Sequence, residues 1–90
     1  MKIVAVCGMG IGTSVLLKLN AEKVLKLLDI EATVDAVDVA TARAASFSAQ
    51  IVLTTPELVE SLKGVPAEVI PIEHFFDLEE ISTKLSKALL

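Results

Sequence analysis

Residues 3–14 of the 90-residue chain read Ile-Val-Ala-Val-Cys-Gly-Met-Gly-Ile-Gly-Thr-Ser, and they carry the clearest indication of its fold. Its first four residues are apolar and mostly β-branched, which predicts a short strand buried on both faces. Glycine then occupies every second position from Gly8 to Gly12, and a helical pattern begins at Ser14. A buried strand that turns through glycines into a helix is typical of a parallel α/β sheet.

The same change of periodicity recurs along the rest of the chain. Further strands are expected over residues 32–37, 50–54 and 68–72. Helices are expected over residues 14–28, over residues 41–47, from Pro56 to near Gly64 with Thr55 as N-cap, and from Asp77 onward with Glu80 as capping-box partner. This alternation predicts one α/β domain over residues 1–90, with a four-stranded parallel sheet in the order 2-1-3-4 and helices on both faces. Pro71 cannot donate to a strand ladder, which places the fourth strand at an edge.

Composition excludes several classes of protein. The chain is 53% hydrophobic and 22% charged, which excludes disorder, and its single cysteine excludes a disulfide scaffold and indicates a reducing, cytoplasmic setting. The net charge of −4, without a basic patch or aromatic platform, argues against nucleic-acid binding. The uncharged residues 3–17 are interrupted by glycines and fall short of the roughly 20 residues that span a bilayer. No signal segment and no membrane insertion are therefore expected.

The turn after the first strand has three physical properties that together indicate a phosphate site. Its glycines leave backbone N–H groups uncovered, so the turn can wrap around an anion. It leads into a helix N-terminus, where free N–H groups and the helix dipole favour negative charge, including the thiolate of Cys7. The sequence thus predicts a catalytic Cys7 in a cradle formed by Gly8, Met9, Gly10, Ile11, Gly12, Thr13 and Ser14, the last two also offering hydroxyl donors. A core cysteine beside a tightly packed turn is the alternative, but packing does not need so much bare backbone.

Competing motifs fail on spacing. The dinucleotide fingerprint is G-x-G-x-x-G, whereas this chain has G-x-G-x-G, and no lysine precedes Thr13 or Ser14 as a Walker loop requires. Gly10 stands where a C-x-x-C redox site has its second cysteine. A low-molecular-weight tyrosine phosphatase needs an arginine where Thr13 stands, and the single arginine, Arg43, is distant in sequence. No cofactor and no metal are therefore expected.

Residues 3–20, which end in Val-Leu-Leu-Lys-Leu-Asn, resemble the IIB components of the bacterial phosphoenolpyruvate:sugar phosphotransferase system (PTS). The C-G-x-G-x-G-[ST]-S loop is most similar to the ascorbate type (L-ascorbate/galactitol class). The resemblance implies a flavodoxin-like, IIB-like fold for the whole chain and a phosphotransferase activity. It implies that Cys7 accepts phosphate from a phosphohistidine of a IIA protein. The phosphate would then pass to a sugar or an ascorbate-like sugar acid bound to a membrane IIC transporter.

Two other functions stay open at this stage, namely a IIB-like regulatory or anion-binding domain and a small Cys-dependent phosphatase. A relay must hold a phosphoryl group without hydrolysing it, and a turn without arginine or acid fits that task. Outside the turn, Asp38 is expected to be structural or solvated, and Lys18 to be solvated. His74 is expected to be a surface or half-packed residue rather than the phosphohistidine of a IIA-type carrier. Thr54 and Thr55 are expected to end near the site.

Overall fold

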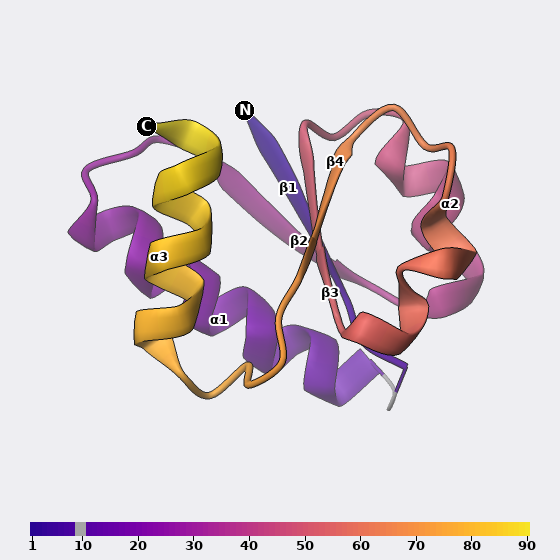
Figure 1. Cartoon of the computed structure of the whole chain (residues 1–90), viewed down its shortest axis with the longest axis horizontal. Helices are drawn as coiled ribbons and strands as arrows, with labels where there is room; N and C mark the ends of the chain where they lie inside the picture. Colours follow the sequence, from indigo (N-terminus) through magenta and orange to yellow (C-terminus); the bar gives the residue numbers. More distant parts are fainter. Residues whose placement is uncertain (9–10) are drawn as a thin grey trace.

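A parallel sheet runs through the centre of the computed structural model, which describes residues 1–8 and 11–90 (Figure 1). Its described strands are β1 (Lys2–Val6), β2 (Thr33–Val37), β3 (Ile51–Thr54) and β4 (Glu68–Pro71). They lie in the order β2-β1-β3-β4, and each neighbouring pair is parallel. The predicted order is confirmed, and β4, which contains Pro71, is an edge strand as expected.

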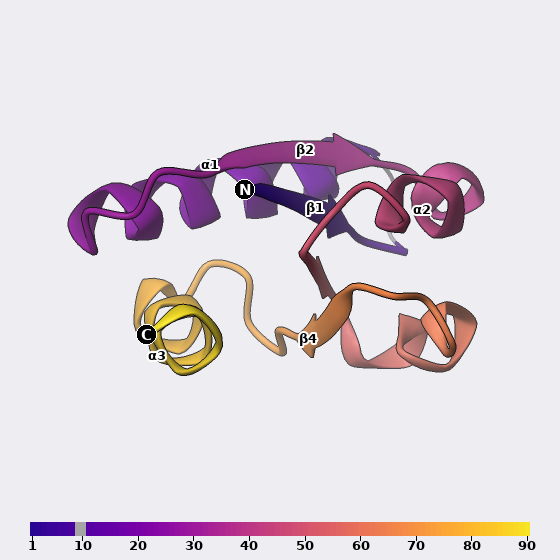
Figure 2. The ribbon, with the colours of Figure 1, turned by 90° about the horizontal axis from the view of Figure 1, so that it is seen from above.

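Helices cover both faces of the sheet, as Figure 2 shows from above. On one face lie α1 (Ile11–Leu27) and α3 (Leu78–Leu89), and on the other lie α2 (Val39–Ser46) and the 3₁₀ turns η1 (Pro56–Leu58) and η2 (Glu60–Leu62). The two 3₁₀ turns replace the helix predicted from Pro56 to near Gly64. Their N–H groups bond three residues back, as in Leu58 to Thr55 and Leu62 to Val59, so the short segment closes tight turns instead of an α-helical ladder.

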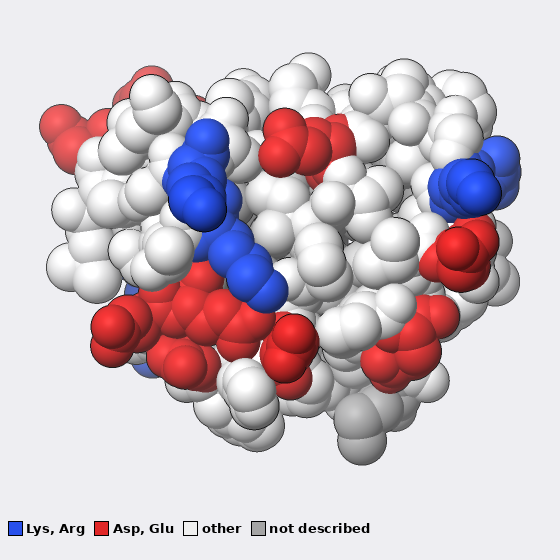
Figure 3. Space-filling view, viewed as in Figure 1, with Lys and Arg blue, Asp and Glu red and all other residues white. Residues whose placement is uncertain are grey.

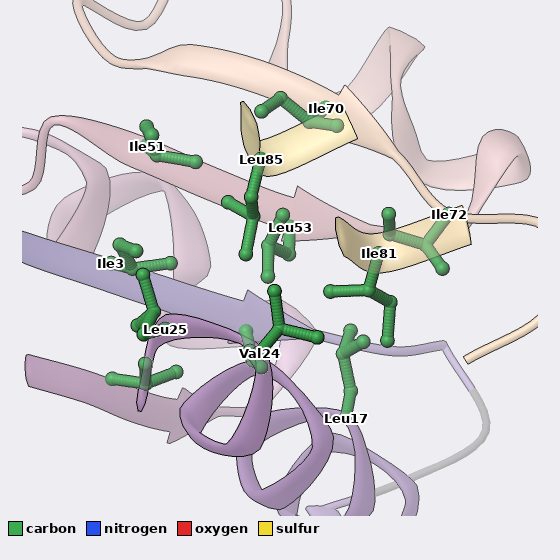
Figure 4. Packing of buried hydrophobic residues seen from close by; sticks show 13 residues of the cluster. Ile3, Leu17, Val24, Leu25, Ile51, Leu53, Ile70, Ile72, Ile81 and Leu85 are labelled. Carbon is green, nitrogen blue, oxygen red and sulfur yellow. The ribbon is translucent and has the colours of Figure 1, made fainter. Parts of the chain in front are cut away.

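The alternation of side chains along β1 builds a core on each face. Ile3 and Ala5 belong to the cluster on the α1 and α3 side, where Figure 4 shows Leu17 and Val24 of α1 facing Ile81 and Leu85 of α3. Val4 and Val6 belong to the cluster on the other side, with Val52, Ala42 and Leu62. All four residues of this run are fully buried, which confirms the prediction of a strand buried on both faces.

The helix starts show where local sequence rules hold and where they fail. Asp77 caps α3, since its carboxylate accepts from the amides of Glu79 and Glu80. The expected capping box is wrong, because the Glu80 carboxylate instead accepts from the amides of Glu73 and His74 at 2.7 and 2.9 Å. The Asp77 amide donates to the carbonyl of His74 at 2.8 Å. Within the described ranges, no helix combines the length and apolarity needed to cross a membrane.

Candidate functional site

Cys7 lies directly after β1, at the carboxyl edge of the sheet and between the ends of β2 and β3. Its thiol is free, and the residue is fully buried. Its amide donates to the hydroxyl oxygen of Ser14 at 3.0 Å. Because Ser14 is also fully buried in the first turn of α1, this bond fastens the end of the strand to the start of the helix. The hydroxyl predicted to contact phosphate therefore has a structural task within the turn.

The first turn of α1 offers backbone N–H groups without competing carboxylates. The helix begins at Ile11, earlier than predicted, so the N–H groups of Ile11, Gly12 and Thr13 have no acceptor within their own helix. No acidic residue occurs in this turn, and the first one in the whole chain is Glu22. Gly12 is exposed, and a Cβ added to it would meet nothing within 4 Å. The helix start is therefore open to an external anion and electrostatically suited to one.

The structure brings together Cys7, Gly8 and the start of α1, as the sequence predicts. A Cβ at Gly8 would lie 3.7 Å from Leu58 of η1, so the segment after β3 packs against this side of the turn. Met9 and Gly10 were also predicted to bind phosphate, and they lie outside the described residues. For Ile11 only the backbone is described.

Two threonines follow one another at the end of β3, and both have buried hydroxyl groups. Thr54 is fully buried and Thr55 is 5% exposed. Neither hydroxyl has a hydrogen-bond partner in the described part of the chain. Thr55 occupies the cap position of η1, but its side chain makes no capping bond, so the predicted capping role of this side chain is wrong. A buried hydroxyl without a partner costs about 1–3 kcal/mol, and these two therefore need an explanation.

The segment between β4 and α3 is held by Glu80, whose side chain is 15% exposed. Besides the two backbone amides, its carboxylate lies 2.7 Å from the ammonium of Lys84 and 3.3 Å from Nδ1 of His74. Burial opposes ionisation of Glu80. The hydrogen bonds from Lys84, Glu73 and His74 outweigh this effect and lower its pKa from 4.5 to about 2. The His74 side chain is 73% exposed, so the structure places it at the surface, as expected.

The other two residues named from the sequence, Asp38 and Lys18, interact with neighbours in their own segments. Asp38 caps α2 by accepting from the amide of Thr41 at 2.9 Å and from its hydroxyl at 2.8 Å. These two bonds lower the pKa of Asp38 below its usual value and give it the expected structural role. Lys18 forms an ion pair with Glu22 at 3.7 Å on the surface of α1.

Asn20 is a linking residue that no expectation from the sequence concerned. Its side-chain amide donates to the carbonyl of Phe75 at 2.6 Å and so links α1 to the segment between β4 and α3. The residue is only 9% exposed and lies beside Leu17 and Val24 on the apolar face of α1. A polar residue on an apolar helix face is the signal that could have identified it, because a buried amide needs a partner.

A hollow of about 640 Å³ lies at the opposite edge of the sheet, between the end of α1 and the start of β2. Glu22, Asp29 and Glu31 line it together with Lys26. The carboxyl end of a helix and several carboxylates repel anions. This hollow is therefore unsuited to phosphate, in contrast to the edge that holds Cys7.

Comparison with known proteins agrees with this geometry. The family model "PTS system, Lactose/Cellobiose specific IIB subunit" matches residues 2–87. The ascorbate-specific PTS system EIIB component of Mycoplasma pneumoniae is 33% identical over 88 residues, which cover 97% of this chain and 93% of the relative. The solved lactose-specific IIB domain of Streptococcus pneumoniae superimposes with a TM-score of 0.66 at 16% identity. That match covers 99% of this chain and 94% of the solved one, and it confirms the fold.

The family match spans nearly the whole chain, and the relative from Mycoplasma pneumoniae has nearly the same length. The resemblance found in residues 3–20 thus extends over all the strands and helices. This chain belongs to the PTS IIB family, whose components are phosphotransferases that act in sugar uptake together with IIA and IIC components.

Proposed function

We propose that Cys7 is the phosphoryl carrier of this IIB protein. Its thiolate accepts phosphate from the phosphohistidine of a IIA protein and passes it to a sugar or sugar acid held by a membrane IIC transporter. The observation that carries this proposal is the position of Cys7 after β1, beside an α1 first turn that offers free N–H groups and no acid. This arrangement can stabilise both a thiolate and a phosphoryl group on sulfur.

Each of the two phosphoryl transfers is an in-line displacement at phosphorus, in which one bond to phosphorus forms as another breaks. In the first, the deprotonated sulfur of Cys7 forms an S–P bond while the N–P bond of phosphohistidine breaks, and the imidazole nitrogen keeps the electron pair. The thiol proton has already passed to solvent. In the second, a hydroxyl oxygen of the sugar forms an O–P bond, the S–P bond breaks, and the thiolate is restored. The hydroxyl proton passes to a base or water on the IIC side. The helix N–H groups stabilise the charge on the phosphoryl oxygens in both steps.

A carrier fits the surroundings of Cys7 better than a phosphatase does. Hydrolysis of a thiophosphate needs a group that activates water and a cation such as a guanidinium on the phosphoryl oxygens. Arg43 serves another purpose, since its guanidinium donates to the carbonyls of Ser61 and Lys63 at 3.2 and 3.0 Å on the α2 side.

The 33% identity to an ascorbate-specific component supports an ascorbate-like sugar acid as the transported substrate. A IIA protein and a membrane IIC transporter of that type are then the partners on the cytoplasmic side. This chain needs no membrane insertion, nucleic acid, cofactor or metal for the transfer itself, because sulfur, backbone N–H groups and the partner histidine supply the chemistry.

The test is the intact mass of the protein after incubation with phosphoenolpyruvate, the general PTS proteins and an ascorbate-type IIA. We expect one phosphate adduct on the wild type, none on Cys7→Ser and the wild-type amount on His74→Ala. Addition of IIC-containing vesicles with ascorbate should discharge the adduct without releasing inorganic phosphate. Absence of any adduct would overturn the relay in favour of a binding domain. An adduct lost in His74→Ala would show that the carrier residue is wrong, and release of inorganic phosphate would indicate a phosphatase.

A further inference from the structure

Thr55 directly follows β3, as Cys7 directly follows β1. The parallel pairing of β1 with β3 ends at Val6 and Thr54, so continuing this register by one residue places Thr55 next to Cys7. Thr55 keeps an extended backbone, with φ −85° and ψ 154°. Side chains alternate between faces along a strand. Ala5 and Leu53 belong to the cluster under α1 and α3, and therefore Cys7 and Thr55 share that face.

The hydroxyl of Thr55 has the character of a ligand group. Thr55 is 5% exposed, and its hydroxyl has no hydrogen-bond partner among residues 1–8 and 11–90. The hydroxyl oxygen of an N-cap threonine ordinarily accepts a hydrogen bond from an amide of the following turn. Here the Leu58 amide bonds to the backbone carbonyl of Thr55 instead, at 3.0 Å. The hydroxyl is thus retained in the buried row of Cys7 without a structural task.

We propose that Thr55 is a phosphoryl-binding residue whose hydroxyl donates a hydrogen bond to an oxygen of the phosphoryl group on Cys7. The inference rests on the proposed relay. It adds a donor from the residue that follows β3 to the N–H groups of α1, so that the phosphoryl group is held from two sides. A buried hydroxyl that gains a partner only when the group arrives binds the charged state selectively, because it has no bond to give up.

The phosphoryl oxygens suit this hydroxyl better than the sulfur does. Neighbouring strands lie about 4.8 Å apart, so side chains of one row are close but need not touch. The hydroxyl makes no bond to the Cys7 sulfur in this structure. A phosphoryl group on that sulfur places charged oxygens between the two side chains, where a hydroxyl donor is most effective.

Thr54 provides a matched control one residue away. Its hydroxyl is also buried and unpartnered in the described ranges. It lies in the row of Val6, on the face where Val6 and Val52 form the second core cluster. Thr54→Val and Thr55→Val therefore make the same chemical change at two buried positions, but only the second change is on the face of Cys7.

The experiment measures the rate of phosphocysteine formation from phosphorylated IIA by quenched-flow mass spectrometry, and the lifetime of the adduct in buffer. Thr55→Val and Thr55→Ala should each slow formation by about 10- to 100-fold, the range for one hydrogen bond to a charged group. Thr55→Ser keeps the hydroxyl and should stay within about 3-fold of the wild type, since the donor is retained. Thr54→Val should match the wild type. Equal alkylation rates of Cys7 by iodoacetamide in all variants would show that the thiol and its surroundings are intact.

The outcomes separate this inference from the relay on which it rests. If the wild type and Thr55→Val are phosphorylated equally fast, the role of Thr55 is wrong and the relay stands. If Thr55→Ser is as slow as Thr55→Val, the shape of the side chain matters rather than the hydroxyl, and the inference is again wrong. If the wild type takes no phosphate, the relay fails and the role of Thr55 fails with it. Two hydroxyl-free variants are included so that loss of folding in one of them leaves the other to decide.

Discussion

The β1–α1 and β4–α3 connections both leave the carboxyl edge of the sheet and enter helices on the same face. They differ in whether carboxylates of the chain itself bind their backbone amides. The β4–α3 connection supplies its own anions, with Asp77 capping the helix and Glu80 binding the amides of Glu73 and His74. Figure 3 shows acidic side chains gathered over the start of α3. The β1–α1 connection contains no acid, and none occurs before Glu22.

This difference distinguishes a structural connection from the one that we propose to bind the phosphoryl group. Amides that bind internal carboxylates are satisfied in the resting protein, and their segment is fixed. Amides at an acid-free helix start remain available for an anion from outside, and their full electrostatic effect appears only when it binds. Under the proposed relay, the amides of the β4–α3 connection bind an internal carboxylate and those of the β1–α1 connection bind an external phosphoryl group.

Giving α1 an internal anion should produce the largest effect. Gly12→Asp has room for its side chain, since a Cβ there meets nothing within 4 Å. Two like charges about 6 Å apart near a surface repel by about 3 kcal/mol, so phosphocysteine formation should slow on the order of 100-fold. The helix itself should gain stability, because an acid in its first turn complements the dipole. Phosphorylation kinetics and thermal unfolding measure the two effects.

Gly12→Asn is the control for this variant, because it adds the same volume without the charge. Its loss of rate should be much smaller than that of Gly12→Asp, and the difference should shrink at high salt. Equal losses in both variants would mean that the free space at Gly12 matters and the missing charge does not. The contrast between the two connections would then have no electrostatic basis.

Removing the internal anion from the other connection should affect stability instead of transfer. Glu80→Ala removes the bonds to two amides and to Lys84, and should lower the free energy of unfolding by about 2 kcal/mol. Glu79→Ala is the matched control, since Glu79 is the exposed neighbour in the same turn. Urea denaturation measures both. A Glu80→Ala protein as stable as Glu79→Ala would show that this network adds nothing.

The same carboxylate should give the protein a specific response to acid. Its pKa is about 2 in the folded state against an ordinary 4.5, so the unfolded state takes up the proton first as pH falls. The stabilisation by Glu80 is therefore complete above the ordinary pKa and is lost as pH falls from about 4.5 towards 2. The melting temperatures of wild type and Glu80→Gln should differ at pH 7 and converge over this interval. A constant difference would contradict the assignment.

The sequence allowed the sheet order to be predicted because apolar runs and glycine turns act locally. Residues 3–6 are apolar enough to be central, and Pro71 is confined to an edge by its missing N–H. The partners of Glu80 were not predictable in this way. The sequence has the capping-box pattern at Asp77, but the amides of Glu73 and His74 bind the Glu80 carboxylate instead once the chain before α3 folds back.

The geometry of the candidate site was predictable in its position on the sheet and less so in its details. Cys7 and the helix start follow from glycine spacing and chain topology, which the sequence contains. That Ser14 accepts from the amide of Cys7 depends on how the turn closes. The neighbourhood of Thr55 and Cys7 that we infer depends on the strand register, which no local pattern in the sequence indicates. Register and turn closure are tertiary properties, and they decide which polar groups remain for a ligand.

Replacing Lys18 should have the smallest effect on phosphocysteine formation. Such a result would mean that the proposed binding region does not extend along α1 as far as Lys18. Its ion pair with Glu22 is partly exposed at 3.7 Å and has the less favourable order, with the cation nearer the helix N-terminus. Such pairs contribute at most about 0.5 kcal/mol, so Lys18→Met should leave unfolding nearly unchanged. Phosphocysteine formation should stay within about 2-fold of the wild type at 0.15 M salt, because exposed charges are screened over about 8 Å. Glu22→Gln, which frees the ammonium, should likewise have little effect. A tenfold slowing in Lys18→Met that disappears at high salt would instead place Lys18 on the surface that steers the phosphorylated partner, and the binding region would then extend beyond the first turn of α1.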